Sequence, residues 1–383
     1  MKSDKKIRVG VIFGGRSGEH EVSIVSAESV INSLDKNKYE IIPIGITKTG
    51  KWIAGSTAFE ALKSGTKNIL PKYEKLITPD SSKKGLVPVS SNSTGKNGVL
   101  GLDVIIPIIH GPFGEDGTLQ GLLELADIPY AGAGVLASSV AMDKVISKQL
   151  FKQAGLPVLP SVSFLRSDWK SNNRAIIKTI YKSLKFPIFV KPANLGSSVG
   201  IGMANDEKSL ISSILEASRY DRKLLIEQGL KKPREIEISI LGNNDPKASV
   251  PGEIIPCNDF YDYDAKYIDE KSKAIIPAKL SKTITKQITA MAIKAYKTVD
   301  CSGMARVDFL IDHKTNKIYL NEINTIPGFT SISMYPKLWE ASGLSYKNLI
   351  NRLIDLAFER FNDSRKSLTS YKPKINWYKQ SKK

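Results

Sequence analysis

The sequence predicts a protein that combines an α/β portion with an α+β portion, in two or three domains. Near-continuous apolar runs alternate with helical segments over the first third of the chain, which is typical of a parallel sheet with helical crossovers. Later segments have the alternation or apolar density of antiparallel strands. The length of 383 residues indicates the number of domains, at about 100–200 residues each.

The α/β portion is predicted to cover residues 1–137. A Gly-rich turn follows the first strand, and the segment after Gly117 has the leucine spacing of a helix. Residues 55–98 are rich in Ser, Lys and Gly and are expected to form loops or a short hairpin. The expected regular elements are strands at residues 7–13, 40–46 and 103–109, and a helix over about residues 22–34.

Two further domains are predicted at residues 138–229 and 230–370, followed by a polar tail at 371–383. The first of them begins with one helix, AMDKVISKQLFKQAG, which Gly155 and Pro157 end. Its strands are expected at residues 186–191 and 223–228. In the last domain we expect strands at residues 235–241, 249–255, 306–311 and 317–323, and helices at 287–299 and 349–361.

Composition excludes several classes of protein. Apolar residues make up 41% and charged residues 25%, as in a soluble globular protein, and no apolar run approaches the roughly 18 residues of a membrane span. Only Cys257 and Cys301 are present, which argues against a disulfide framework or structural zinc and favours a reducing cytoplasm. The net charge is +18, but the lysines are scattered, which indicates a solvated basic surface rather than a nucleic-acid site.

The sharpest chemical pattern is a set of oxygen ligands near the C-terminal end. Glu322 and Asn324 lie two positions apart on one expected strand, so their side chains leave the same face, and Asp308 on an adjacent strand could oppose them. Each acid taken singly is more simply a solvated strand position. Together they form a hard, all-oxygen set suited to Mg²⁺ held against phosphates.

The loop VKPANLGSSVGIG follows a buried strand that ends at Lys191. Gly196, Ser197 and Ser198 make it flexible and supply small residues and hydroxyls that suit a phosphate. Most Gly/Ser turns are only turns, so the loop alone is a moderate signal. It lacks the GK[ST] of a P-loop, and GGRSG near the N-terminus does not match GxGxxG.

Other single residues have two interpretations. Lys144 is a solvated helix lysine unless it meets Lys191 at one polyphosphate. Glu227 lies among apolar positions, as a purine slot would require, and the strand at residues 103–109 ends just before His110, where open α/β sheets bind ligands. Glu21, in the run EHE, is about equally consistent with an anchor for an amino group and with an acid at a helix N-terminus.

In this order, the motifs resemble the D-alanine–D-alanine ligase family of the ATP-grasp superfamily. The resemblance spans nearly the whole chain and rests on GGRSGEHEVS, HGPFGEDGTLQG, MDK, VKPANLGSSVG, FYDYDAKY, ARVDF and NEINTIPGFTSISM. It implies three domains in the ATP-grasp architecture, including an N-terminal parallel-sheet domain, with ATP between two of them. It also implies ATP-dependent ligation of two D-alanines through a D-alanyl phosphate, for peptidoglycan synthesis.

Matched motif by motif, the resemblance also implies roles for single residues. The phosphates of ATP would be held by Lys144, Lys191, Ser197 and Ser198, the adenine by Glu227 and the ribose by Glu235. Two Mg²⁺ or Mn²⁺ ions would be held by Asp308, Glu322 and Asn324. The first D-alanine would be bound by Glu21 and His110, and the second by Ser333 and Met334, where relatives often have leucine.

The resemblance assigns the chemical steps to a smaller set. Glu21, Ser197 and Tyr267 would form a hydrogen-bonded group, in a site covered by residues 259–277. Arg306 and the backbone N–H of Gly328 would stabilise the tetrahedral oxyanion. Related ligases that make D-alanyl-D-lactate tend to carry histidine in the covering loop, whereas AKYIDEK has none, which predicts a dipeptide product.

The resemblance further implies a homodimer through the first domain and a cytoplasmic location, and it leaves a monovalent-cation requirement open. Another ATP-grasp carboxylate–amine ligase, or a D-alanine–D-lactate ligase, is the nearest alternative function. A basic ATP-binding protein that acts on nucleic acid without catalysis is an alternative from another class. The two lysines and the three metal-ligand candidates argue against that last class.

Overall fold

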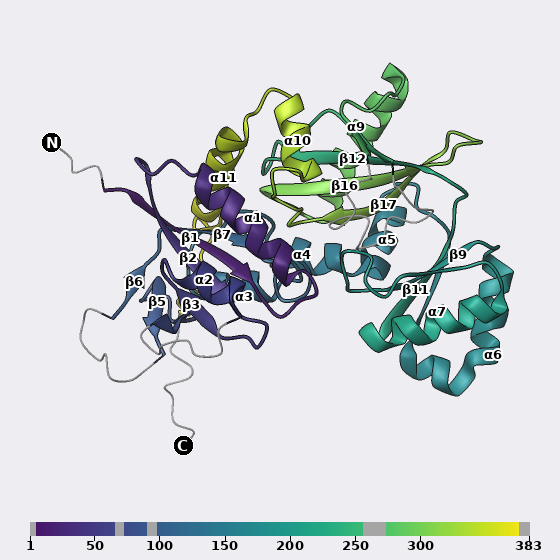
Figure 1. The fold of residues 1–383 in the computed structure, drawn as a ribbon, viewed down its shortest axis with the longest axis horizontal. Helices are drawn as coiled ribbons and strands as arrows, with labels where there is room; N and C mark the ends of the chain where they lie inside the picture. Colours follow the sequence, from purple (N-terminus) through teal and green to yellow (C-terminus); the bar gives the residue numbers. More distant parts are fainter. Residues whose placement is uncertain (1–4, 66–72, 90–97, 256–272, 375–383) are drawn as a thin grey trace.

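The computed structural model describes residues 5–65, 73–89, 98–255 and 273–374. Figure 1 shows the N-terminal sheet on one side of the molecule and two further sheets on the other. None of the helices in these ranges is both long and apolar enough to cross a membrane. The mixed α/β and α+β class predicted from the sequence is confirmed.

The N-terminal unit is a four-stranded sheet in the order β3-β2-β1-β7, in which β1, β2 and β7 are parallel. The prediction of a buried parallel strand is confirmed, because β7 is buried at all of its positions. Its elements are β1 (Ile7–Gly14), α1 (His20–Ser33), β2 (Tyr39–Ile46), β3 (Trp52–Ala54), α2 (Ala58–Lys63), β7 (Val104–Ile108) and α3 (Thr118–Leu125).

The Ser/Lys/Gly-rich stretch contains the expected hairpin and also a short helix, α2, which the sequence did not predict. The hairpin consists of β4 (Lys75–Ile77) and β5 (Gly85–Pro88), and β6 (Leu100–Gly101) extends it to three antiparallel strands. This small sheet lies beside the N-terminal sheet and away from the other two sheets (Figure 1).

The helix predicted through AMDKVISKQLFKQAG is wrong in one respect. The structure has two helices, α4 (Val135–Met142) and α5 (Lys144–Gln153), which separate at Asp143. The Asp143 carboxylate accepts the backbone N–H groups of Val145 and Ile146 at 3.0 and 3.1 Å, so it caps α5 and stops α4. The new helix therefore begins at Lys144, which becomes part of the site.

The central unit is an antiparallel sheet in the order β10-β9-β11-β8, with α6 and α7 against one face (Figure 1). Apolar residues of the strands and helices form one core, which includes Ile180, Ile188, Ile214 and Ile226. The elements are β8 (Ser161–Leu165), α6 (Arg166–Ser183), β9 (Ile188–Pro192), β10 (Gly202–Ala204), α7 (Glu207–Tyr220) and β11 (Lys223–Gln228).

The third sheet has the order β15-β14-β12-β16-β17, with β13 beside β12. Its antiparallel pairing confirms the prediction for this segment. The helix α9 begins earlier than predicted, because the Ser281 hydroxyl caps it. The elements are β12 (Arg234–Leu241), β13 (Lys247–Ala248), β14 (Gly252–Ile255), β15 (Lys273–Ile275), α9 (Lys282–Thr298), β16 (Met304–Ile311), β17 (Ile318–Asn324), α10 (Met334–Ala341) and α11 (Tyr346–Ser364).

The last helix packs against the first sheet. Leu349 and Leu353 of α11 share a buried core with Val9 and Val11 of β1, and Figure 1 shows α11 beside α1 and β7. Two segments that are far apart in sequence, β1 and α11, therefore pack against each other. The N-terminal unit is consequently held against the unit that carries β16 and β17.

Candidate active site

One cavity of about 610 Å³ opens between the central sheet and the third sheet. Both predicted phosphate lysines and both predicted metal carboxylates line it, namely Lys144, Lys191, Asp308 and Glu322. These groups come from α5, β9, β16 and β17, so no one stretch of sequence forms the cavity. Other predicted residues that line it are Ser197, Ser198, Glu227, Glu235 and Arg306.

The acids lie opposite one another on neighbouring strands. Asp308 of β16 pairs in register with Glu322 of β17, and Arg306 pairs with Asn324. The Arg306 guanidinium donates to both oxygens of Asp308 at 2.7 Å and lies 3.1 Å from Glu237. Burial lowers the pKa of Arg306, but Asp308 and Glu237 outweigh it and hold that pKa well above the ordinary value. Arg306 is therefore a permanent cation in the cavity wall.

The predicted metal ligands Asp308, Glu322 and Asn324 fit divalent cations by the chemistry of their donor atoms. Asp308 and Glu322 line the cavity, and the amide nitrogen of Asn324, on the same strand as Glu322, donates to Asp308 at 3.0 Å. Mg²⁺ prefers oxygen ligands completed by substrate phosphates and water, which two carboxylates beside an amide group can supply. In this structure each acid forms an ion pair with a basic side chain: Lys144 lies 3.4 Å from Glu322, and Arg306 pairs with Asp308. The described residues hold no larger cluster of His, Cys, Asp and Glu that suits a metal.

A β-bulge places one further residue in the cavity wall. Asp308 pairs with Glu322 while Phe309 pairs with Leu320, which leaves Asn321 as the extra residue of β17. Asn321 and Glu322 consequently both line the cavity, although adjacent strand residues normally face opposite ways. Asn321 was not predicted from the sequence, because a bulge leaves no signal in a pattern of alternating residues.

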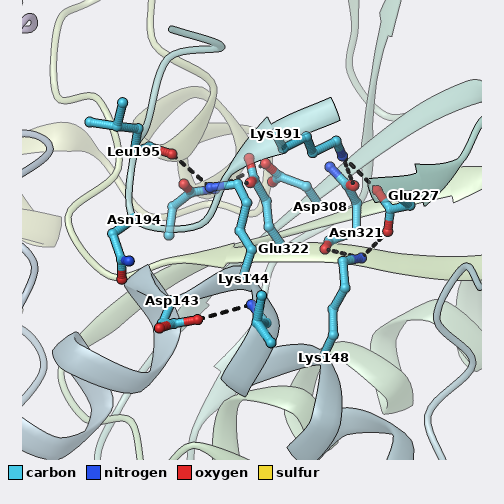
Figure 2. A network of polar contacts seen from close by, with 12 residues as sticks. Asp143, Lys144, Lys148, Lys191, Asn194, Leu195, Glu227, Asp308, Asn321 and Glu322 are labelled. Atoms are coloured by element: carbon cyan, nitrogen blue, oxygen red, sulfur yellow. Dashed lines mark hydrogen bonds and ion pairs between the residues drawn. The ribbon is translucent and has the colours of Figure 1, made fainter. Parts of the chain in front are cut away.

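Two buried lysines hold Glu227 at one end of the cavity. Lys191 lies 2.7 Å from one carboxylate oxygen and Lys148 lies 2.5 Å from the other, and Figure 2 shows the two ammonium groups on either side of Glu227. Burial raises the pKa of Glu227, but the two lysines outweigh it and lower that pKa overall. Lys148 was not predicted from the sequence, since a lysine on a helix is ordinarily solvated.

Lys144 is oriented by the Gly/Ser loop as well as by α5. Its backbone N–H donates to the Ala193 carbonyl at 2.9 Å, and its ammonium donates to the Leu195 carbonyl at 2.7 Å. Ser197 and Ser198 follow with positive φ angles of 49° and 60°, so the loop turns sharply at the cavity. The loop and the lysine are therefore fixed to each other before any ligand binds (Figure 2).

The structure corrects the acid predicted to contact Ser197. The Ser197 hydroxyl donates to Glu19, which is only 6% exposed, whereas Glu21 is 63% exposed and pairs with Lys48. Helix α1 begins at His20, and successive residues of a helix point about 100° apart. The two acids of the run EHE therefore point to different sides, and only Glu19 faces the loop.

The residues predicted to bind D-alanine lie in several environments. His110 is buried, donates through Nδ1 to the Ile326 carbonyl at 2.9 Å, and lies 3.2 Å from the Ser26 hydroxyl. Burial lowers the pKa of His110 and outweighs the opposite effect of Glu19, so the ring is neutral at pH 7. The Ser333 hydroxyl is 2.8 Å from that of Thr330.

The side chain of Met334 packs in a small core with Ile254 and Leu338, where it is 8% exposed. As the first residue of α10 it points inward, because the apolar face of that helix is buried. Its predicted role beside the second D-alanine stays a prediction. Tyr267 and the rest of the covering segment up to residue 272 lie outside the described residues.

A second buried acid, Glu115, joins the loop after β7 to the turn after β17. Glu115 accepts the backbone N–H of Gly111 at 2.8 Å and that of Ile326 at 3.2 Å. Together with His110, it holds both the N–H and the carbonyl of Ile326. The turn that leads from Asn324 to Gly328 is thus fixed by side chains of the N-terminal unit.

Comparison with known proteins gives consistent matches over nearly the whole chain. A family model described as "D-ala D-ala ligase N-terminus" matches residues 8–133, and one described as "D-ala D-ala ligase C-terminus" matches residues 150–355. The chain is 52% identical to a D-alanine–D-alanine ligase of Natranaerobius thermophilus, over 96% of this chain and 99% of that protein. It is 49% identical to that of Chloroherpeton thalassium, over 94% and 98% of the two chains.

Solved structures are similar as well. The D-alanine–D-alanine ligase from Coxiella burnetii is 38% identical with a TM-score of 0.81, over 94% of this chain and 96% of that one. The VanG D-Ala:D-Ser ligase from Enterococcus faecalis is 35% identical with a TM-score of 0.81, over 92% and 100%.

Proposed function

This chain belongs to the D-alanine–D-alanine ligase family, and on that premise we propose that its large cavity is where ATP phosphorylates the first D-alanine. The chain is an ATP-dependent, ADP-forming ligase that joins two D-alanines for cell-wall synthesis. One observation carries the assignment of the site. Lys144 and Lys191 line the same cavity as Asp308 and Glu322, so cations and acids surround one space.

The cavity suits ATP in size and charge. Its volume of about 610 Å³ lies within the range of about 300–1,000 Å³ that is usual for ligand sites. Lys144 and Lys191 would neutralise phosphate oxygens. Ser197 and Ser198 would line the loop around the phosphates. Glu227 would bind adenine and Glu235 would bind ribose.

The first chemical step is phosphoryl transfer. A carboxylate oxygen of the first D-alanine attacks the γ-phosphorus and ADP leaves, which is a step that needs positioning and charge neutralisation.

Asp308, Glu322 and Asn324 are the residues that would hold two Mg²⁺ or Mn²⁺ ions. When bound, such ions neutralise charge on the phosphates. The paired carboxylates and their present contacts with Lys144 and Arg306 support this assignment, because each acid already requires a counter-charge.

The second step joins the amino acids. The amine of the second D-alanine attacks the acyl carbon, phosphate leaves, and the nitrogen gives up a proton. We assign the ammonium of the first D-alanine to Glu19 in place of Glu21, because Glu19 is buried and bonded to Ser197. Arg306 and the N–H of Gly328 would stabilise the tetrahedral oxyanion. Ser333 would hold the carboxylate of the second D-alanine, and His110 would lie near the first D-alanine.

We further propose the division of the chain into residues 1–137, 138–229 and 230–370, with the nucleotide between the second and third parts. A homodimer through the first part and a cytoplasmic location remain proposals from the family resemblance.

Substitution of Glu322 tests the assigned site. Glu322→Gln keeps the size of the side chain but removes its charge, and we expect phosphate release that depends on D-alanine to fall about 10²–10³-fold, equivalent to about 2.7–4 kcal/mol of barrier. Glu216→Gln, at an exposed ion pair on α7, is the matched control and should retain full activity. A fully active Glu322→Gln enzyme would remove Glu322 from the phosphoryl-transfer site.

A further inference from the structure

Behind the cavity wall lies Lys148, which none of the roles above uses. It is one helical turn after Lys144 on α5, its side chain is 5% exposed, and in the described structure it does not line the cavity. Its ammonium lies 2.5 Å from Glu227 and donates to the backbone carbonyl of Asn321 at 3.1 Å. Lys148 therefore touches two residues of the cavity wall without entering the cavity.

The burial of this ammonium is costly. Burial lowers the pKa of Lys148, and the charge of Glu227 opposes that effect only in part. Well-packed apolar side chains can replace a buried ion pair without loss of stability, and often with a gain. The presence of a buried charge at this position therefore indicates a role other than packing.

The geometry around Glu227 indicates what that role is. Each oxygen of Glu227 has its own lysine, with Lys148 on Oε1 and Lys191 on Oε2, so the plane of the carboxylate is fixed. Without Lys148, Glu227 could turn both oxygens toward Lys191 and draw that ammonium away from the cavity. The contact with Asn321 also holds the bulge that directs Glu322 into the cavity (Figure 2).

We propose that Lys148 is a positioning residue for the nucleotide, which holds Glu227 as a fixed acceptor and keeps Lys191 directed at the cavity. The proposal rests on the proposed function, which places the purine beside Glu227. A carboxylate with two lysines retains lone pairs that can accept from the 6-amino group of adenine, whereas the 6-oxo group of guanine is itself an acceptor and is repelled. Lys148 thereby contributes to the choice of ATP over GTP.

The test compares Lys148→Met with Lys152→Met, which changes an exposed lysine on the same helix. Phosphate release is measured while ATP, GTP and D-alanine are varied in turn. For Lys148→Met we expect KM for ATP to rise about 10–100-fold, by analogy with the loss of groups that orient the ligands of a metal ion. The preference for ATP over GTP should fall, while kcat and KM for D-alanine should stay within about twofold of the control.

Two further measurements keep the outcome interpretable. Lys148→Met, Glu227→Gln and the variant with both substitutions form a double-mutant cycle. The effects of the two single substitutions on KM for ATP should be non-additive, because Lys148 acts through Glu227. The shift in thermal unfolding on adding a non-hydrolysable ATP analogue should shrink in Lys148→Met even where the variant is less stable than wild type.

Equal KM values for ATP in Lys148→Met and Lys152→Met would overturn the proposal, as would additive effects in the cycle. A general loss, with kcat and KM for D-alanine affected as much as KM for ATP, would also overturn it. These results differ from failure of the proposed function, in which the wild-type protein itself shows no phosphate release that depends on D-alanine.

Discussion

At the scale of single residues, the charges of the cavity are balanced side chain against side chain. Arg306 neutralises Asp308, Lys144 lies beside Glu322, and two lysines hold Glu227. Groups held in this way are already oriented before substrate arrives, which is how preorganised sites stabilise developing charge without reorganisation. Removing one partner should therefore cost more than the removal of a similar charge at the surface.

Glu19 and Glu21 allow that expectation to be tested within one motif. Glu19→Gln removes the buried charge beside Ser197, and the loss of a charged hydrogen bond to substrate should cost about 1.5–3 kcal/mol, roughly ten- to 150-fold in kcat/KM for D-alanine. Glu21→Gln changes only an exposed ion pair, and its effect should stay within about 0.5 kcal/mol. Steady-state kinetics decide the matter, and equal losses in the two variants would contradict the assignment of Glu19.

Glu115 should make stability depend on pH. Burial, and then the charge of Glu19, raise the pKa of Glu115 from 4.5 to about 8. Between these two values the folded protein retains a proton that the unfolded chain releases, so stability from this group is complete below pH 4.5 and is lost as pH rises toward 8. Glu115→Gln cannot titrate. Denaturant unfolding from pH 5 to 8 should show the wild type losing stability relative to the variant, and parallel curves would count against the shift.

Residue type and spacing predicted part of the site well. Lys144, Lys191, Asp308 and Glu322 were identified because their motifs are distinctive, and the structure brings them to one cavity. Lys148 could not be found in that way, because its burial depends on β11 and β17, which are distant in sequence.

At the scale of elements, the turns carry the conformations that the site requires. Gly111 has a φ of 74°, and a Cβ there would lie 2.6 Å from a carboxylate oxygen of Glu19. The turn after β7 and Glu19, which directly precedes α1, can therefore approach closely only because Gly111 has no side chain.

Gly111→Ala should displace Glu19 and strain the turn. The left-handed conformation alone costs about 1–2 kcal/mol for a residue with a Cβ, and we expect lower stability together with reduced ligase activity. Gly121→Ala on α3 is the control, because a Cβ there meets nothing within 4 Å. An alanine inside that helix should stabilise the protein by about 0.5–1 kcal/mol. Denaturant unfolding and phosphate release measure both variants, and unchanged activity in Gly111→Ala would argue against the close approach.

Most strands and helices were predictable because apolar runs and alternation follow directly from burial. The exceptions share a local cause that periodicity does not show. Asp143 divides a helical pattern by capping its second half, and Asn321 interrupts strand alternation with a bulge. Each exception lies next in sequence to a residue of the cavity, Asp143 before Lys144 and Asn321 before Glu322.

At the scale of the whole molecule, the proposed site draws residues from the N-terminal unit, the central unit and the third sheet. The N-terminal unit carries Glu19 and Glu115, the central unit carries Lys191, and the third sheet carries Asp308 and Glu322. Arg360 of α11 donates to the carbonyls of Tyr130 and Gly132, which ties the last helix to the first unit. Sequence alone indicates the units but not these contacts, because none of them is local.

We propose above that the γ-phosphoryl group passes from ATP to a D-alanine carboxylate in this cavity. D-alanine labelled with ¹⁸O in its carboxylate tests this transfer directly. If the carboxylate oxygen attacks the phosphorus and phosphate later leaves the acyl carbon, the released phosphate carries an ¹⁸O atom from D-alanine, and mass spectrometry should find it in step with dipeptide formation. Phosphate that contains no oxygen from D-alanine, released while dipeptide accumulates, would contradict the account.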